Sequence, residues 1–151
     1  LQRTLTMIEK YFQGVIPEVA SDDDELKGAS RVTHDKMGHE MDNLQFSRAL
    51  EVVWEFIARV NKFIEEKKPW FLAKTSDTRP QLATVLGTLA MAIKDISVFI
   101  YPFMPKTAAE IQRQLGMLEN NQPLCLEFRQ KLKEGTVARK GKPLFPKIES
   151  A

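Results

Sequence analysis

The sequence has little of several features that would point to a particular chemistry. It contains one cysteine among 151 residues, Cys125, which excludes an internal disulfide and a zinc site built from several cysteines. No apolar run approaches the roughly 18 residues that a membrane span needs. Neither GxGxxG nor GxxxxGK(S/T) occurs, so no glycine-rich loop for a phosphate is evident. The formal net charge of +2 is too small to indicate a nucleic-acid partner by itself.

What the chain does contain is typical of one soluble domain. With 151 residues, 43% hydrophobic and 28% charged, it is long enough to bury its own core without disulfides or metals. The chain opens on Leu1 in the middle of a helical pattern. We therefore expect it to be a fragment of a longer protein.

The most strongly periodic stretch runs from Asp42 to Lys74. Its apolar residues recur at steps of three and four, the spacing of one buried helix face, and Trp54 widens that face. They are Phe46, Leu50, Val53, Ile57, Val60 and Ile64. Asp42 is the expected N-cap, and Pro69 is expected to end the helix, because proline lacks a backbone N–H and disfavours helical geometry in the preceding residue. We expect this helix to be the central column of a bundle.

Further helices are predicted on both sides of this column. Residues 1–13 are expected to be the end of a helix that Gly14 stops, and two more helices start near Thr78 and Thr107, each with a capping box. Residues 124–132 form a last short helix, whereas residues 21–42 show no clear period. The predicted fold is all-α, an antiparallel helix bundle over residues 1–122. A C-terminal helix and irregular tail, residues 123–151, are expected to pack back on the bundle in the same domain, docking Leu144, Phe145 and Ile148.

No catalytic constellation is found. Cys125 lies in the apolar run PLCLEF, which is typical of a packed thiol rather than of a nucleophile. His34 and His39 are five residues apart, a spacing that does not align two metal ligands on one helix face, so we expect solvated loop histidines. The sequence therefore favours a binding or architectural role over catalysis.

Three residues near the predicted apolar faces are candidates for recognition. Arg3 lies off the apolar line of the first helix, so it faces water or a ligand. Asn61 lies at the edge of the central helix's face, where its amide is expected to tie that helix to a neighbour. Trp70 has two interpretations: a core residue that fills the gap at the helix break, or an exposed ring on which a nucleobase stacks, contributing about 1–3 kcal/mol.

Four stretches of the chain resemble, in the right order, segments of methionyl-tRNA synthetases, a class I aminoacyl-tRNA synthetase family. FSRALEVVWEFIARVNKFIEEKKPWFLAK is similar to their pattern FxxALxxxWxxIxxxNxYIxxxxPWxLAK in the helical anticodon-binding domain. LQRTLTMIEKYFQGVIP resembles the helix that joins the catalytic core to that domain, and YPFMPKTAAEIQRQLG resembles the PFMP-type segment. GKPLFPKIE resembles the segment near the end of the synthetase core. The resemblance covers nearly the whole chain except about residues 21–41.

The resemblance implies a bundle of the class I synthetase anticodon-binding type that reads the CAU anticodon of methionine tRNA. It implies that Arg3, Pro69 and Trp70 handle the anticodon. Arg3 matches the arginine of an Asn-x-x-x-Arg pair whose asparagine would lie before Leu1. HIGH-like and KMSKS-like motifs do not occur in the sequence, so we expect no catalytic residue here, and no metal-binding residue or cofactor either.

The resemblance also implies the setting in which the chain works. ATP and methionine would bind the catalytic domain, which is expected to be a partner within the same chain, in the cytoplasm and away from any membrane. Two alternatives stay open. One is the equivalent domain of a class I synthetase for valine, leucine, isoleucine or cysteine, although the KKPWFLAK and PLFPKIE runs favour methionine. The other is a helical protein-interaction module with no RNA role, in which Trp70 is buried.

Overall fold

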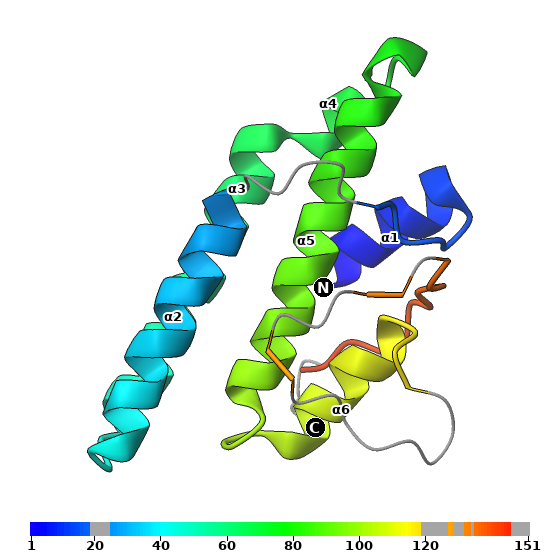
Figure 1. The fold of residues 1–151 in the computed structure, drawn as a ribbon. Coiled ribbons are helices and arrows are strands. Elements are labelled where there is room, and N and C mark those ends of the chain that lie inside the picture. Colours follow the sequence, from blue (N-terminus) through cyan, green and yellow to red (C-terminus); the bar gives the residue numbers. More distant parts are fainter. Residues whose placement is uncertain (19–24, 119–126, 129–131, 134, 146–151) are drawn as a thin grey trace, which may run out of the picture.

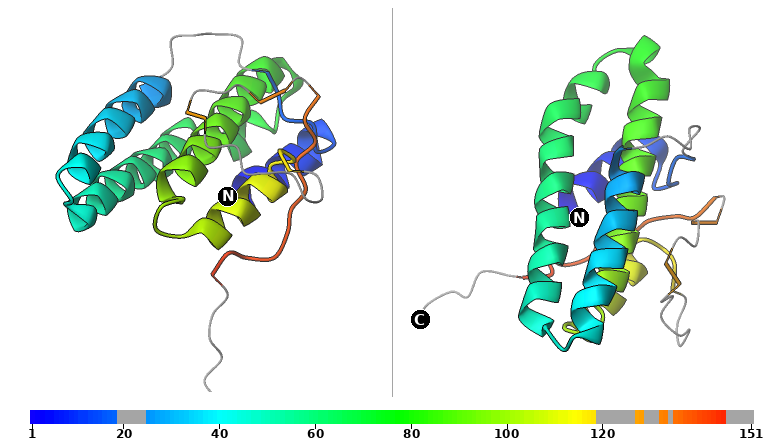
Figure 2. Two further views of the ribbon diagram at one scale, coloured as in Figure 1. Left: turned by 60° about the horizontal axis from the view of Figure 1, so that its bottom comes forward. Right: turned by 60° about the vertical axis from the view of Figure 1, so that its left-hand side comes forward.

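The computed structural model describes residues 1–18, 25–118, 127, 128, 132, 133 and 135–145. Within these residues the chain forms six α-helices and one short 3-10 helix (Figure 1). They are α1 (Gln2–Phe12), α2 (Glu25–Asp42), α3 (Phe46–Lys67), α4 (Pro69–Leu72), η1 (Ser76–Thr78), α5 (Arg79–Ile100) and α6 (Pro105–Gln114). The long helices α2, α3 and α5 run up and down beside one another, and α1 and α6 lie on the other side of α5 (Figures 1 and 2). The predicted all-α antiparallel bundle is confirmed; the division into residues 1–122 and 123–151 stays a prediction.

The central column of the bundle is α5, not α3 as the sequence predicted. Helix α5 packs against α1, α2, α3, α4 and α6, and 14 of its 22 residues are buried. Its apolar side chains surround the helix, which is the pattern of a helix with neighbours on every side. Helix α3 has its main contacts with α2 and α5 only.

Residues 76–100, which end in α5, form a segment long and apolar enough to cross a membrane. The sequence analysis expected no such segment. However, 72% of the most apolar window is buried inside the bundle, as in the core helix of a soluble protein. The composition of α5 therefore reflects its central place in the fold.

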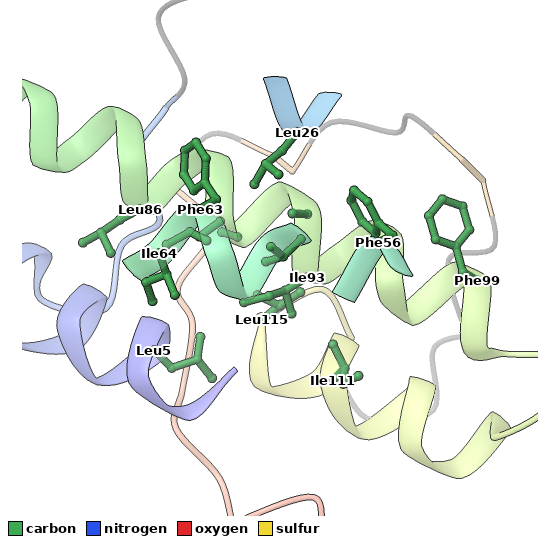
Figure 3. Packing of buried hydrophobic residues seen from close by; sticks show 14 of the residues in the cluster. Leu5, Leu26, Phe56, Phe63, Ile64, Leu86, Ile93, Phe99, Ile111 and Leu115 are labelled. Atoms are coloured by element: carbon green, nitrogen blue, oxygen red, sulfur yellow. The ribbon is translucent and has the colours of Figure 1, made fainter. Parts of the chain in front are cut away.

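One continuous core joins the helices (Figure 3). Leu5 of α1, Leu26 of α2, Phe56 of α3, Leu86 of α5 and Leu115 after α6 are each no more than 2% exposed. Burying one such side chain contributes about 1.5–3 kcal/mol. The core thus fixes the relative positions of the helices that carry the candidate residues.

A buried polar network crosses this core at the middle of α5. The Lys94 ammonium is fully buried and donates hydrogen bonds to Oδ1 of Asp95, 3.2 Å away, and to the carbonyl oxygen of Glu127, 2.9 Å away. The other carboxylate oxygen of Asp95 accepts a 2.6 Å hydrogen bond from the Ser30 hydroxyl on α2. The network therefore connects α5 to α2 and to the segment after α6.

Helix α2 is the element that the sequence analysis missed. It covers most of residues 21–42, and His34 and His39 are exposed on it rather than in a loop. Its buried residues include Ser30 and Thr33, so the apolar period is weak. Its last residue is Asp42, and the predicted cap of the next helix is therefore wrong: α3 starts at Phe46, after Leu44 has turned the chain with a φ of 57°.

Two further details of the helices differ from prediction. The buried face of α3 consists of Ala49, Val53, Phe56, Val60, Phe63 and Ile64. Trp54, Phe46 and Asn61 are exposed, because the buried face of α3 is directed toward α2 and α5 and these three residues lie outside it. Helix α6 begins at Pro105, two residues before the predicted Thr107 cap.

The C-terminal segment crosses the ends of α1 and α6. The N–H of Ile16 donates to the carbonyl of Thr136, and the N–H of Ala138 donates to the carbonyl of Gly14. Leu144 packs against the core as predicted, but Phe145 is 70% exposed because it extends away from the bundle. Ile148 and Cys125 lie outside the described residues, as does most of the predicted helix 124–132, whose described residues are not helical.

Candidate functional site

The break between α3 and α4 positions Trp70. Lys68 has a left-handed backbone, with φ 44° and ψ 58°, and it ends α3 while capping α4. Pro69 occupies the first position of α4, where its missing N–H costs nothing and its fixed φ is already helical. The Pro69 ring is fully buried. Pro69 therefore anchors the turn from inside and sets the direction of the next side chain.

Trp70 is half-buried at this break. Its side chain packs against the hydrophobic core and also remains partly accessible to solvent. Trp70 is therefore neither the fully buried plug nor the fully exposed ring that the two interpretations from the sequence described. A ring held in this way loses little conformational freedom when a base stacks on it.

Arg3, in the first turn of α1, contacts α3 shortly before the break. Its side chain is 67% exposed, and Nη1 lies 2.7 Å from Oε1 of Glu65 in the last part of α3. Glu65 precedes Trp70 by five residues, a separation that spans at most about 18 Å even in an extended chain. The Arg3 side chain therefore reaches the part of α3 that precedes α4, from the start of α1, which lies beside the middle of α5 (Figure 1).

The Arg3–Glu65 ion pair does not lock the arginine. Exposed pairs of this kind contribute about 0–1 kcal/mol, because water and salt screen both charges. The guanidinium has five N–H donors, and one of its nitrogens is engaged with Glu65. Its other donors can address an acceptor on a base edge or a phosphate.

The sequence analysis passed over two neighbours of Trp70. Phe71 is 56% exposed, and the Lys74 ammonium lies 4.3 Å from the centre of its ring. An exposed aromatic ring beside a cation is a surface on which a base can stack while the cation meets the backbone. The sequence feature that could have pointed to Phe71 and Lys74 is their position in the PWFLAK run, where they follow Trp70.

The start of α5 closes this end of the bundle. The Arg79 guanidinium lies 5.0 Å from the centre of the Phe12 ring and donates a 3.0 Å hydrogen bond to the carbonyl oxygen of Tyr11. These contacts hold the last turn of α1 to the first turn of α5. They fix the C-terminal end of α1, whereas Arg3 lies in its first turn.

The described part of the chain contains no group of three or more histidine, cysteine, aspartate or glutamate side chains that could hold a metal ion. His34 instead stacks on Phe128, with ring centres 4.1 Å apart. The chemistry of the Arg3–Trp70 end is that of aromatic stacking, fork-shaped donors and lysine charge.

Comparisons with known proteins agree with the fold and show the family to which the chain belongs. A family model described as the anticodon-binding domain of tRNA ligase matches residues 30–140. Over 99% of its length the chain is 43% identical to the methionine–tRNA ligase of Caldanaerobacter subterraneus subsp. tengcongensis and 38% identical to that of Clostridium tetani. These matches cover 24% of each relative, so the chain spans about a quarter of their length.

The fold is similar to that of a solved synthetase. The free-state structure of Mycobacterium tuberculosis methionyl-tRNA synthetase superposes with a TM-score of 0.88 at 24% sequence identity. The superposition covers 99% of this chain and 31% of that one. The whole helical arrangement is therefore found as one part of a larger protein.

Proposed function

Because the chain belongs to the family of anticodon-binding domains of tRNA ligases, we propose that it binds the anticodon loop of methionine tRNA and reads its CAU anticodon. The observation that carries this proposal is the half-buried Trp70 at the α3–α4 break, together with the exposed Arg3 side chain, which pairs with Glu65 five residues before Trp70. The methionine assignment is supported by the relatives that match along nearly the whole chain, which are methionine–tRNA ligases.

In this proposal each residue has a separate task. The Trp70 ring stacks on an unstacked anticodon base, as aromatic side chains do in the recognition of single-stranded loops. Arg3 addresses the edge of that base, and it leaves Glu65 at little cost because their pair is exposed. Pro69 does not touch the RNA through its buried ring and acts by positioning Trp70.

The activity of a complete ligase is part of the same proposal. ATP-dependent attachment of methionine would take place on the part of a ligase outside this sequence, in the cytoplasm. The present chain would contribute by holding the tRNA and discriminating among anticodons. Such a division uses binding energy far from the reacting atoms to orient the substrate.

The test is a titration of an RNA stem-loop that carries the CAU anticodon, followed by fluorescence anisotropy. Trp70→Ala should weaken binding by about 1–3 kcal/mol, or roughly 5- to 150-fold, with circular dichroism unchanged. Trp54→Ala is the matched control, because Trp54 is an exposed tryptophan on another part of the surface, and it should leave the affinity unchanged.

Equal losses for the two variants would contradict a stacking role for Trp70. Failure of the unaltered chain to bind the CAU loop better than a scrambled loop would reject the proposed function. That second outcome would favour a helical protein-interaction module.

A further inference from the structure

Helix α3 carries an apolar line that the bundle leaves open. Phe46 and Trp54 are 51% and 49% exposed. Leu50, between them in the sequence, and Ile57, three residues after Trp54, are half-buried. Steps of four, four and three residues place the four side chains along one side of the helix. We call these four residues the α3 stripe.

The α3 stripe lies beside the buried face of α3, not on it. The buried face packs on α2 and α5, so the apolar arc of α3 is wider than these two neighbours cover. A helix with so wide an arc normally has a further neighbour. Leu44, in the turn before α3, is 72% exposed and extends the open apolar surface at one end.

Beyond the stripe, the same side of α3 meets α1 at one ion pair. Continuing the line of the stripe by four residues leads to Asn61 and then to Glu65, which pairs with Arg3 of α1. The α3 stripe is therefore open up to the point where this single exposed ion pair joins α3 to α1.

The chemistry of the stripe favours a protein surface over RNA as its ligand. Its four residues are apolar, and binding to a nucleic-acid backbone depends on cations that neutralise phosphates. Contiguous exposed apolar side chains on a soluble protein are typical of contacts with another protein surface. About three quarters of each curated relative lies outside the matched region, so in such a ligase a large protein surface is tethered to this bundle.

Resting on the proposed function, we propose that the α3 stripe is the surface on which the rest of the methionine–tRNA ligase chain docks. Tethering makes this contact intramolecular, so a modest apolar area is enough to hold it. Docking here would fix the direction of α3, and with it the Trp70 end, relative to the rest of the ligase.

The experiment compares the accessibility of the stripe in two proteins. One is this chain alone, and the other is a chimera in which this chain replaces the matched quarter of the Caldanaerobacter ligase. Trp54→Cys is labelled with a maleimide in both, after Cys125→Ser has removed the native thiol. Val32→Cys is the matched control, because Val32 is 53% exposed on α2, away from the stripe.

We expect labelling at position 54 to be at least about tenfold slower in the chimera than in the chain alone, with equal rates at position 32. Trp54→Lys should lower the melting temperature of the chimera more than Val32→Lys does, and the two should be equivalent in the chain alone. This second comparison does not depend on the cysteine variants.

Equal labelling rates at position 54 in the two proteins would overturn the proposal. The proposal would also be overturned if labelling at position 54 in the chain alone slowed as the protein concentration rose and sedimentation showed a dimer. That result would assign the stripe to a second copy of the chain. Binding of the CAU stem-loop is measured on the same samples. Loss of RNA binding with the stripe still protected would reject the proposed function alone.

Discussion

Replacing Lys94 by methionine should destabilise the bundle more than any change of a surface lysine. The Lys94 ammonium is fully buried and faces the Asp95 carboxylate at 3.2 Å. Methionine has a similar length and fills the space, so the main effect is electrostatic. Lys94→Met leaves Asp95, whose side chain is 12% exposed, with the Ser30 hydroxyl as its remaining named partner.

The expected loss of unfolding free energy is about 3–5 kcal/mol, because removing one member of a buried ion pair leaves the other charge uncompensated. This is a large share of the roughly 5–15 kcal/mol by which domains are stable. Adding Asp95→Asn removes the stranded charge while keeping an acceptor for Ser30, so the double variant should recover most of the loss. Lys62→Met is the control, because Lys62 is exposed and its pair with Glu66 spans 3.6 Å.

Urea denaturation followed by circular dichroism measures the unaltered chain, the Lys94→Met, Asp95→Asn and Lys62→Met variants and the double variant. A loss below about 1 kcal/mol for Lys94→Met would refute the reasoning, since it would mean that Asp95 is solvated well enough to need no partner. A double variant as unstable as the sum of the two single changes would refute it as well, because the penalty is assigned to their interaction.

Two further predictions concern the RNA surface and the C-terminal segment. Lys74→Gln should weaken binding equally for CAU and altered loops and lower the slope of log affinity against log salt by about 0.7, as loss of one phosphate contact does; a sequence-dependent loss would indicate a base contact instead. Gly116→Ala should cost more in urea denaturation than Gly135→Ala. Both glycines have a φ near +75°, but a Cβ at Gly116 would lie 2.1 Å from the carbonyl oxygen of Val137, and at Gly135 it meets nothing within 4 Å. Equal costs would show that the segment moves aside freely.

The helices that sequence predicts best are those with one apolar period and a backbone stop. The start of α5 was predicted near Thr78, and the helix begins at Arg79, although Thr78 makes no side-chain cap hydrogen bond. The α3–α4 break was predicted from Pro69 because a missing N–H acts locally. Such features depend on the residue and its immediate neighbours.

What the sequence could not predict depends on partners far along the chain. Helix α2 buries Ser30, which is tolerated because Asp95, 65 residues away, accepts its hydrogen bond. The apolar arc of α3 was too wide to tell which part faces α5, so Trp54 was placed in the core. The pairing of Arg3 with Glu65, 62 residues apart, likewise follows from the packing of α1 and not from a motif.

The most direct test of the account is the ratio of dissociation constants for two stem-loops that differ only in the first anticodon base, CAU and GAU. Reading of a base edge by Arg3, with the base stacked on Trp70, predicts that the CAU loop binds about 5- to 150-fold more tightly, and that Arg3→Ala reduces the ratio toward one. A ratio of one for the unaltered chain would contradict the claim that this end of the bundle reads the anticodon.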